Sequence, residues 1–240
     1  MVLAVREPQR SLALTERNVF LIGLNEFNLR MLRRIRGAEH YRFHGLLEPS
    51  EVIEQASWDI DVLLDAARAH LDTFDGHVDA VAGYIDFPVS LMVPILCREL
   101  GLRSPTLEAM LKCEHKHWSR MEQRAAIPDH VPASRVFDPT DDASVASIDL
   151  PYPYWVKPVK SYGSHLGFRV GNGRELEAAI ESIRRRLPRL AVPFGRILEH
   201  ATLPEPIAAL PPHACVAEAL IGGRQCTLEG FVSDGCFEVF

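Results

Sequence analysis

A lysine followed by a short Ser/Gly segment is the feature of this sequence best suited to chemistry. Lys157 closes an apolar stretch that begins at Pro153, and Ser161, Gly163 and Ser164 follow it. A lysine at the mouth of a buried strand is costly unless an anion neutralises its charge. Serine and glycine also let backbone N–H groups approach a phosphate without a bulky side chain in the way. The combination indicates a site for a nucleotide triphosphate.

The order of the lysine and the glycines excludes a Walker loop. That motif reads Gly-x4-Gly-Lys-Ser/Thr and opens a helix directly. Here Lys157 precedes the glycines, the segment runs into an expected strand at residues 166–170, and a helix is expected only after Gly173. A flexible β-loop, rather than a helix N-terminus, would therefore hold the phosphates. Taken alone, the stretch is equally consistent with a surface hairpin that carries a solvated lysine.

Composition narrows the class of protein. The 240 residues are 47% hydrophobic and 24% charged, as in ordinary globular proteins, and the net charge of −6 gives no general attraction to nucleic acid. No apolar run reaches the roughly 18 residues that span a membrane, and no signal peptide is recognisable. The five cysteines form no CxxC pair, which fits reduced thiols. We expect a cytoplasmic protein that binds neither nucleic acid nor membrane.

Strands and helices are expected to alternate over residues 17–104, which predicts an α/β domain with a doubly wound parallel sheet. Strands are expected at residues 18–24, 41–46 and 78–84, and helices at 49–56, 59–71 and 89–100. Asp86 precedes the last helix, and capping that helix is favoured over a role beside the substrate. The segment around Gly23 is not a GxGxxG fingerprint, so the topology implies no dinucleotide. Residues 1–16 are expected to be a leader.

Over residues 105–240 the sequence predicts helices and strands that do not alternate regularly. One long helix is expected from Pro105 to Ile127, and another at residues 175–187. Strands are expected at residues 132–136, 166–170, 196–200 and 216–221. A final hairpin is expected through Asp234 and Gly235, because Asp-Gly favours the tight turn between two strands.

In this order, the segments over about residues 17–240 resemble the ATP-grasp superfamily of ATP-dependent carboxylate ligases. The resemblance implies a Rossmann-like pre-ATP-grasp domain at residues 17–104, followed by an incomplete ATP-grasp α+β domain at 105–240. Within the second domain it implies a lid at about 132–212 and the start of the C-terminal lobe at 213–240.

The resemblance also implies which residues bind ATP. Lys116 matches the family's first nucleotide lysine, although His115 stands where the family more often has aspartate. Lys157 matches the second lysine, and both ammonium groups would neutralise phosphate charge. The mobile loop over the triphosphate matches Ser161, Gly163 and Ser164.

The hinge that would hold the nucleoside begins at Glu218. Adenine would be read by the carbonyl of Ala219 and the amide of Ile221. Gln225 stands where the family usually has a ribose-binding glutamate. Its amide accepts a hydroxyl hydrogen bond without charge, so we expect weaker ribose binding.

The family's Mg²⁺ ligands, which are acidic residues and an asparagine on later strands, have no match before Phe240. We therefore name no metal ligand and no catalytic residue. Mg²⁺ is expected in a full-length protein, and this chain is expected to be a C-terminally truncated fragment that is inactive alone. Cys113, His115 and His117 do not offer a zinc site, because only two of them share a helix face.

Two functions from different classes follow. The resemblance implies a ligase that uses ATP to activate a carboxylate as an acyl-phosphate, which an amine or similar nucleophile then attacks. Bicarbonate as the carboxylate, as in biotin carboxylases, is a variant. The substrates would be small molecules, and a homodimer is left open. The alternative is a non-catalytic nucleotide-binding or interaction module.

Overall fold

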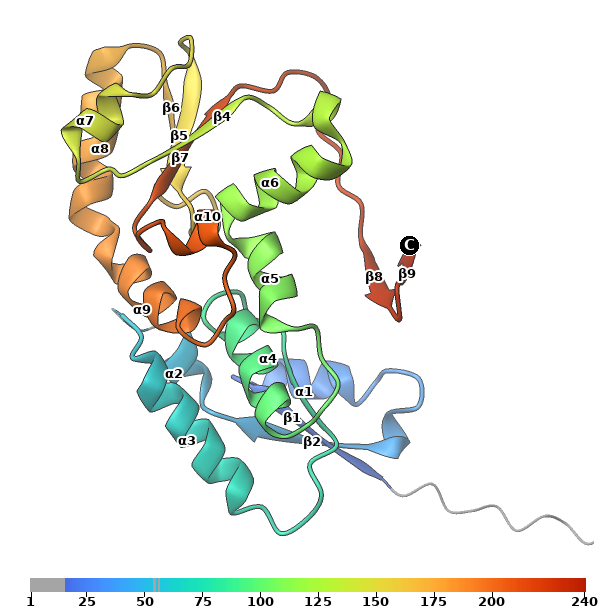
Figure 1. Ribbon diagram of the computed structural model, residues 1–240. Coiled ribbons are helices and arrows are strands. Elements are labelled where there is room, and N and C mark those ends of the chain that lie inside the picture. The colour runs from blue at the N-terminus through green and yellow to red at the C-terminus, as the bar shows by residue number, and fades with distance from the viewer. Residues whose placement is uncertain (1–15, 54, 56) are drawn as a thin grey trace, which may run out of the picture.

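The computed structural model describes residues 16–240 except 54 and 56, so the expected leader lies almost wholly outside the described residues. Its strands form a three-stranded sheet in the order β2-β1-β3, a four-stranded sheet in the order β4-β7-β5-β6, and a separate hairpin, β8-β9 (Figure 1). We call the first two the parallel sheet and the antiparallel sheet. The α/β class predicted from the sequence is confirmed.

The parallel sheet contains β1 (Arg17–Ile22), β2 (Tyr41–Leu46) and β3 (Ala80–Gly83), and β1 pairs in parallel with both neighbours. Phe20 and Ile22 of β1 are buried in its core. The helices around it are α1 (Glu26–Leu32), the 3-10 helix η1 (Ala38–His40), α2 (Pro49–Val52), α3 (Ile60–Asp72) and α4 (Val89–Glu99). All three predicted strands and the helices after them are confirmed, apart from their exact ends.

Asp86 does not cap α4, so that prediction is wrong. The N-cap position belongs to Pro88 and receives no side-chain hydrogen bond. Asp86 Oδ1 instead accepts from the amide of Phe87 at 2.6 Å and lies 3.3 Å from Lys160 Nζ. Lys160, which Asp86 contacts instead of the helix end, is 74 residues away in the chain. The local spacing that suggested a cap could therefore not reveal this contact.

The single helix expected between residues 105 and 127 is also wrong. The chain forms α5 (Leu107–Glu114) and α6 (Lys116–Ala126), and then the 3-10 helix η2 (Pro128–His130). His115 separates them with φ −80° and ψ 99°, which is extended backbone. Its Nδ1 accepts from the amide of Trp118 at 3.2 Å, and the amide of Lys116 donates to the carbonyl of Val159 at 2.8 Å. Both amides thus have partners that a continuous helix would not give them.

The antiparallel sheet contains β4 (Ser134–Phe137), β5 (Tyr154–Pro158), β6 (Phe168–Val170) and β7 (Cys215–Ala219). The predicted lysine hairpin is the β5–β6 pair. On its other side β5 pairs antiparallel with β7, which places Trp155 opposite Glu218 and Lys157 opposite Val216. The short helix α7 (Asp142–Ala146) and the longer helix α8 (Gly173–Arg186) flank this sheet (Figure 1).

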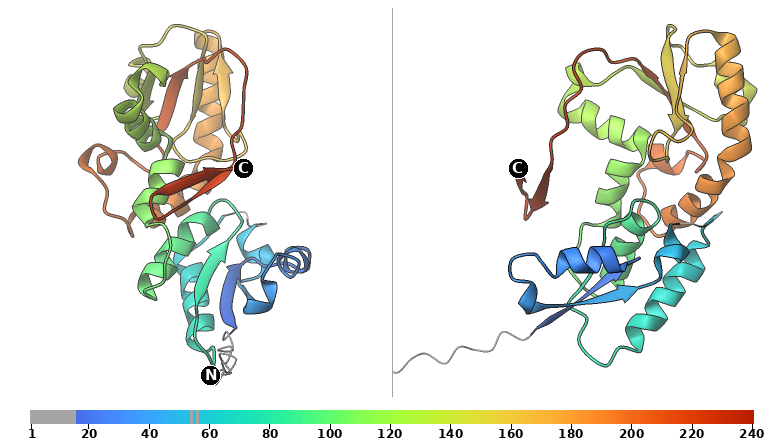
Figure 2. Two further views of the ribbon diagram at one scale, coloured as in Figure 1. Left: turned by 90° about the vertical axis from the view of Figure 1, so that its right-hand side faces the viewer. Right: turned by 180° about the vertical axis from the view of Figure 1, so that it is seen from behind.

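The strand expected at residues 196–200 is a helix instead. Pro188–Leu198 form α9, and Glu205–Ala208 form the short α10. Most buried residues of α9 recur with helical spacing, and the full set is Leu190, Ala191, Pro193, Phe194, Ile197 and Leu198. Leu187 is both the C-cap of α8 and the N-cap of α9, so the two helices follow one another from the antiparallel sheet to the parallel one (Figures 1 and 2). There Arg196 pairs with Asp61 of α3 at 2.5 Å.

The chain ends in the predicted hairpin, formed by β8 (Gly230–Ser233) and β9 (Cys236–Val239). Its turn residues Asp234 and Gly235 both have positive φ, 50° and 79°, as an Asp-Gly turn requires. Arg103 contacts Asp234 at 2.6 Å, yet every residue of both strands is exposed (Figure 2). No helix among the described residues is long and apolar enough to cross a membrane. The domain boundaries expected near residues 104 and 212 stay predictions.

Candidate functional site

Lysine is rare in this chain and concentrated at one place. Only four of the 26 basic Lys and Arg residues are lysines, and all four lie between residues 112 and 160. Three of them meet where β5 ends beside α6: Lys116 opens α6, Lys157 lies on β5, and Lys160 is the second residue after β5. This clustering is a signal in the sequence that the motifs alone did not capture. It indicates a site that needs compact ammonium groups rather than guanidinium groups.

Lys157 and Glu218 form the centre of the site. The Glu218 side chain is only 6% exposed, and its Oε2 lies 2.5 Å from Lys157 Nζ. Arg120 completes the group, with its Nε 2.7 Å from Oε1 of the same carboxylate and its Nη2 donating to Oε2 at 3.4 Å. A buried carboxylate is stable only with such partners. Arg120 lies four residues, or about one helical turn, after Lys116. This spacing could have identified Arg120 as a site residue from the sequence.

Lys116 is also engaged with the protein. Its Nζ donates to the carbonyl of Ser161 at 2.7 Å, so the ammonium reaches the start of the predicted lid loop. Burial lowers the pKa of Lys116 to about 8, with the nearby charges of Lys160 and Lys157 acting in the same direction. The group is therefore still mostly protonated at neutral pH. Neither nucleotide lysine simply faces solvent, because both have partners in the protein.

The loop between β5 and β6 has an unusual backbone. Gly163, Ser164 and Leu166 have φ values of 53°, 59° and 57°, which is the left-handed region. A bulky residue such as Leu166 adopts this region at a cost, and such strain is concentrated at functional sites. A Cβ atom added to Gly163 would meet nothing within 4 Å, so the loop is open on that side. Turns of this kind present backbone N–H groups to anions.

The predicted adenine hinge lies directly after β7. The amide of Ala219 donates to the carbonyl of Ala133 at 2.9 Å and is therefore occupied. Ile221 is 75% exposed, and in the described part of the chain its amide has no hydrogen-bond partner. Gln225 is exposed as well. The structure thus brings Lys116, Lys157, Ser161 and Glu218 together and leaves Ile221 and Gln225 on an exposed segment.

His115 is neutral and structural in this arrangement. It is 2% exposed, and burial lowers its pKa to about 4, with the charges of His117 and Lys116 acting in the same direction. Its Nδ1 is therefore free to accept from the amide of Trp118 and cap α6. Over residues 16–240 without 54 and 56, no group of three or more His, Cys, Asp or Glu side chains could hold a metal ion.

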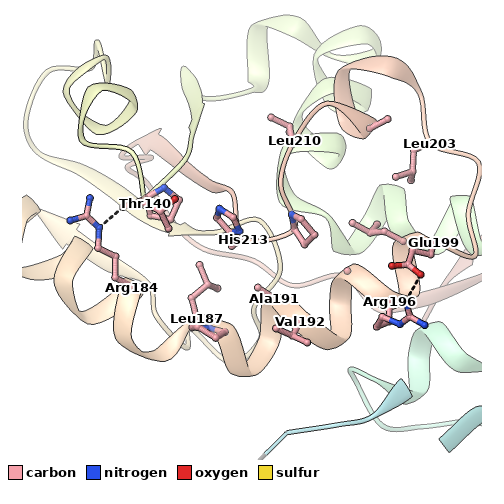
Figure 3. A pocket seen from close by; sticks show the side chains of 16 residues that line it. Thr140, Arg184, Leu187, Ala191, Val192, Arg196, Glu199, Leu203, Leu210 and His213 are labelled. Carbon is pink, nitrogen blue, oxygen red and sulfur yellow. Dashed lines mark hydrogen bonds and ion pairs between the residues drawn. The ribbon is translucent and has the colours of Figure 1, made fainter. Parts of the chain in front are cut away.

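A mostly apolar cavity lies away from the lysines. It measures about 630 Å³ and lies between α8, α9 and the segment around α10, with mostly apolar residues such as Leu187, Val192 and Leu210 along its walls (Figure 3). His213 enters it from the segment before β7, with Nε2 3.2 Å from Asp138 Oδ1. None of the predicted nucleotide residues lines it. The lysine cluster therefore lies outside this cavity.

Comparison with known proteins identifies the fold. No protein-family model and no curated protein matches the sequence. Among solved structures, the L-amino acid ligase from Bacillus licheniformis is 18% identical with a TM-score of 0.67, over 93% of this chain and 51% of that one. The D-alanyl-alanine synthetase A from Vibrio cholerae is 11% identical with a TM-score of 0.59, over 94% and 66%. The carboxyaminoimidazole ribonucleotide synthase from Aspergillus clavatus, complexed with ATP, is 16% identical with a TM-score of 0.53, over 87% and 48%.

These similarities show that the chain shares the fold of these enzymes, which is the fold expected from the resemblance to the ATP-grasp superfamily. The chain spans between 48% and 66% of the length of these three solved chains. The identities are low, so what each relative binds or makes is a property of that relative.

Proposed function

We propose that this chain is the nucleotide-binding part of an ATP-dependent ligase, which activates a small-molecule carboxylate as an acyl-phosphate for attack by an amine or a similar nucleophile. One observation carries the proposal: Lys116 and Lys157 meet beside a strained, open loop at the end of β5. The ATP-grasp fold supports it, because the similar structures include ligases that join amino acids. A cytoplasmic location belongs to the same proposal.

Binding would replace internal partners with phosphate oxygens. Lys116 would release the carbonyl of Ser161, and Lys157 would release the carboxylate of Glu218, which Arg120 still neutralises. Lys116 would exchange a neutral carbonyl acceptor for a charged phosphate oxygen, whereas Lys157 would exchange one anionic acceptor for another. The exchange also frees the loop from Ser161 to Ser164 to fold over the triphosphate.

The hinge after β7 would hold the base. The unpartnered amide of Ile221 can donate to adenine, and the carbonyl of Ala219 can accept from its amino group. Mg²⁺ is the ion expected with the nucleotide, but the described residues offer no ligand set for it, and we assign no residue to it. In this reaction class, catalysis depends on positioning and neutralisation of charge rather than on a protein nucleophile.

Amide hydrogen exchange tests the nucleotide site directly. The amides of Ser161–Ser164 should exchange quickly in the free protein and slowly with ATP, because the loop closes over the phosphates. The hairpin β8–β9 carries exposed amides outside the site and serves as an internal control. Equal protection of the loop in both states would contradict the assignment of the loop as a lid.

ADP release separates the ligase from its alternative when it is measured on a chain extended to the family's full length, beside the present 240 residues. A ligase releases ADP only when a suitable carboxylate and an amine are present with ATP and Mg²⁺. A non-catalytic nucleotide-binding module protects the loop but releases no ADP with any mixture. The exposed apolar residues of the hairpin, such as Phe231, Val232 and Phe237, are the observation that favours an interaction module.

A further inference from the structure

Lys160 is the most deeply buried charged side chain near the site, and the proposed nucleotide contacts do not use it. Its side chain is 3% exposed. Its Nζ forms an ion pair with Glu114, whose side chain is 13% exposed, and lies 3.3 Å from Asp86 Oδ1. The same ammonium lies 5.1 Å from the centre of the Phe87 ring. Since a buried ammonium is costly without such partners, Lys160 is held in this position.

Glu114 connects Lys160 to the break between α5 and α6. Glu114 is the last residue of α5, and Lys116 is the first residue of α6. The amide of Lys116 donates to the carbonyl of Val159, the residue before Lys160. Two neighbouring contacts therefore join the helix break to the end of β5, one on each side of His115.

A third contact continues the series to the loop. Lys116 Nζ donates to the carbonyl of Ser161, the residue after Lys160. The consecutive residues Val159, Lys160 and Ser161 are thus held in turn by the Lys116 amide, the Glu114 carboxylate and the Lys116 ammonium. Removing the charge of Lys160 would free Glu114, the carboxylate two residues before Lys116, to attract the Lys116 ammonium away from the loop.

We propose that Lys160 is a positioning residue, which holds Glu114 at the helix break so that Lys116 points to the phosphate-binding loop. The proposal rests on the proposed nucleotide site. Lys160 itself does not contact the nucleotide, because its ammonium is buried and pairs with Glu114 of α5 and Asp86 of the segment between β3 and α4. It fixes three segments of the chain at the place where the triphosphate enters.

The small number of lysines makes Lys116 directly observable. In protein carrying ¹³C at the lysine ε-carbons, four signals are expected, and each can be followed against pH without nucleotide. In Lys160→Met the Lys116 signal should move and titrate at higher pH, because a positive neighbour is lost and Glu114 becomes available. Lys160→Arg should restore the titration in large part. Lys112→Met, which removes an exposed lysine from α5, should leave the Lys116 signal unchanged.

The same variants are then titrated with ATP, with the lysine signals as the readout. The dissociation constant should rise about tenfold in Lys160→Met and also in Glu114→Gln, as expected for coupled neighbours. Where Lys160→Met does not fold, Lys160→Met/Glu114→Gln replaces it, because Glu114 then carries no unpaired charge. There the change in the Lys116 titration should be smaller, because only the positive neighbour is lost, while the dissociation constant should rise as in Lys160→Met.

Three results separate the possibilities. A folded Lys160→Met protein with the wild-type Lys116 signal and affinity overturns the proposal. Loss of binding in Lys160→Met with full binding in Glu114→Gln also overturns it, since Lys160 would then touch the nucleotide itself. Absence of ATP binding by the wild-type protein overturns the proposed function instead, while the Lys116 signal still shows whether Lys160 places Lys116.

Discussion

The two sheets of this molecule use burial for different purposes. The parallel sheet buries apolar side chains such as Phe20, Ile22 and Val81. The antiparallel sheet also has an apolar core, but it buries Glu218 on β7 and Lys160 at the end of β5. Buried charge adds little to stability and is common at functional sites. Under the proposed function, the parallel sheet is the scaffold and the antiparallel sheet carries the binding site.

Truncating a core residue of the parallel sheet should give the largest effect. Phe20→Ala should lower the free energy of unfolding by about 3–5 kcal/mol, because it leaves a cavity in a packed core. ATP affinity per folded molecule should not change. Urea unfolding and nucleotide titration measure the two quantities. Phe27→Ala, at an exposed position of α1, is the control and should cost under about 0.5 kcal/mol.

The free energy of unfolding should depend on pH through the protonation of His115. Its pKa is lowered to about 4 in the folded protein, whereas an unfolded imidazole takes up a proton below about 6.5. The unfolded state thus binds more protons between these values, and stability is lost as pH falls from 6.5 towards 4. The loss should reach about 3 kcal/mol at 1.36 kcal/mol per pKa unit.

A His115→Asn variant isolates this contribution. Asparagine caps a helix without titrating, so the variant should lose less stability on acidification. Burial also lowers the pKa of His44, His117 and His165, and these groups give both proteins a common slope of the same sign. Unfolding curves at several pH values for the two proteins measure the difference. Identical slopes would show that His115 does not carry the effect.

Removing either nucleotide lysine should weaken ATP binding. Lys116→Ala and Lys157→Ala should each cost about 1.5–3 kcal/mol of binding free energy, the range for charge-assisted hydrogen bonds. Lys157→Ala should also lower stability, since Glu218 then keeps only Arg120 as a partner. Titration with ATP beside a melting curve measures both effects, and Lys112→Ala is the control. Full affinity in a folded Lys157→Ala protein would refute the site.

The smallest effect should come from the loop backbone. Gly163→Ala should cost about 1 kcal/mol of stability, because a left-handed conformation is unfavourable for alanine. No steric clash contributes, since the added Cβ meets nothing within 4 Å. Gly222→Ala is the matched control: its surroundings are equally open and its φ is not positive, so its stability should not fall. Equal melting temperatures for the two variants would show that the loop backbone is unstrained.

Local signals in the sequence predicted local structure well. The strand at residues 41–46 was predicted to the residue, and the final hairpin follows from its Asp-Gly turn. The predictions failed where a distant partner decides the local structure. The helix breaks at His115 because Val159 offers a carbonyl, and Asp86 faces Lys160 rather than a helix end. The ion pairs of Lys160 span 46 and 74 residues of sequence, beyond the reach of any spacing rule.

The uninterrupted passage from α8 into α9 would be the bending point of the proposed lid. Helix α8 flanks the antiparallel sheet, and α9 contacts α3 through the ion pair of Arg196 with Asp61. Movement of β5 and β6 over a nucleotide would therefore either separate α9 from α3 or bend the two helices at Leu187. Pro188 has no N–H and donates no backbone hydrogen bond, so fewer hydrogen bonds hold the helix next to Leu187. Closing the lid should loosen the amides around Leu187 and leave those in the middle of α9 unchanged.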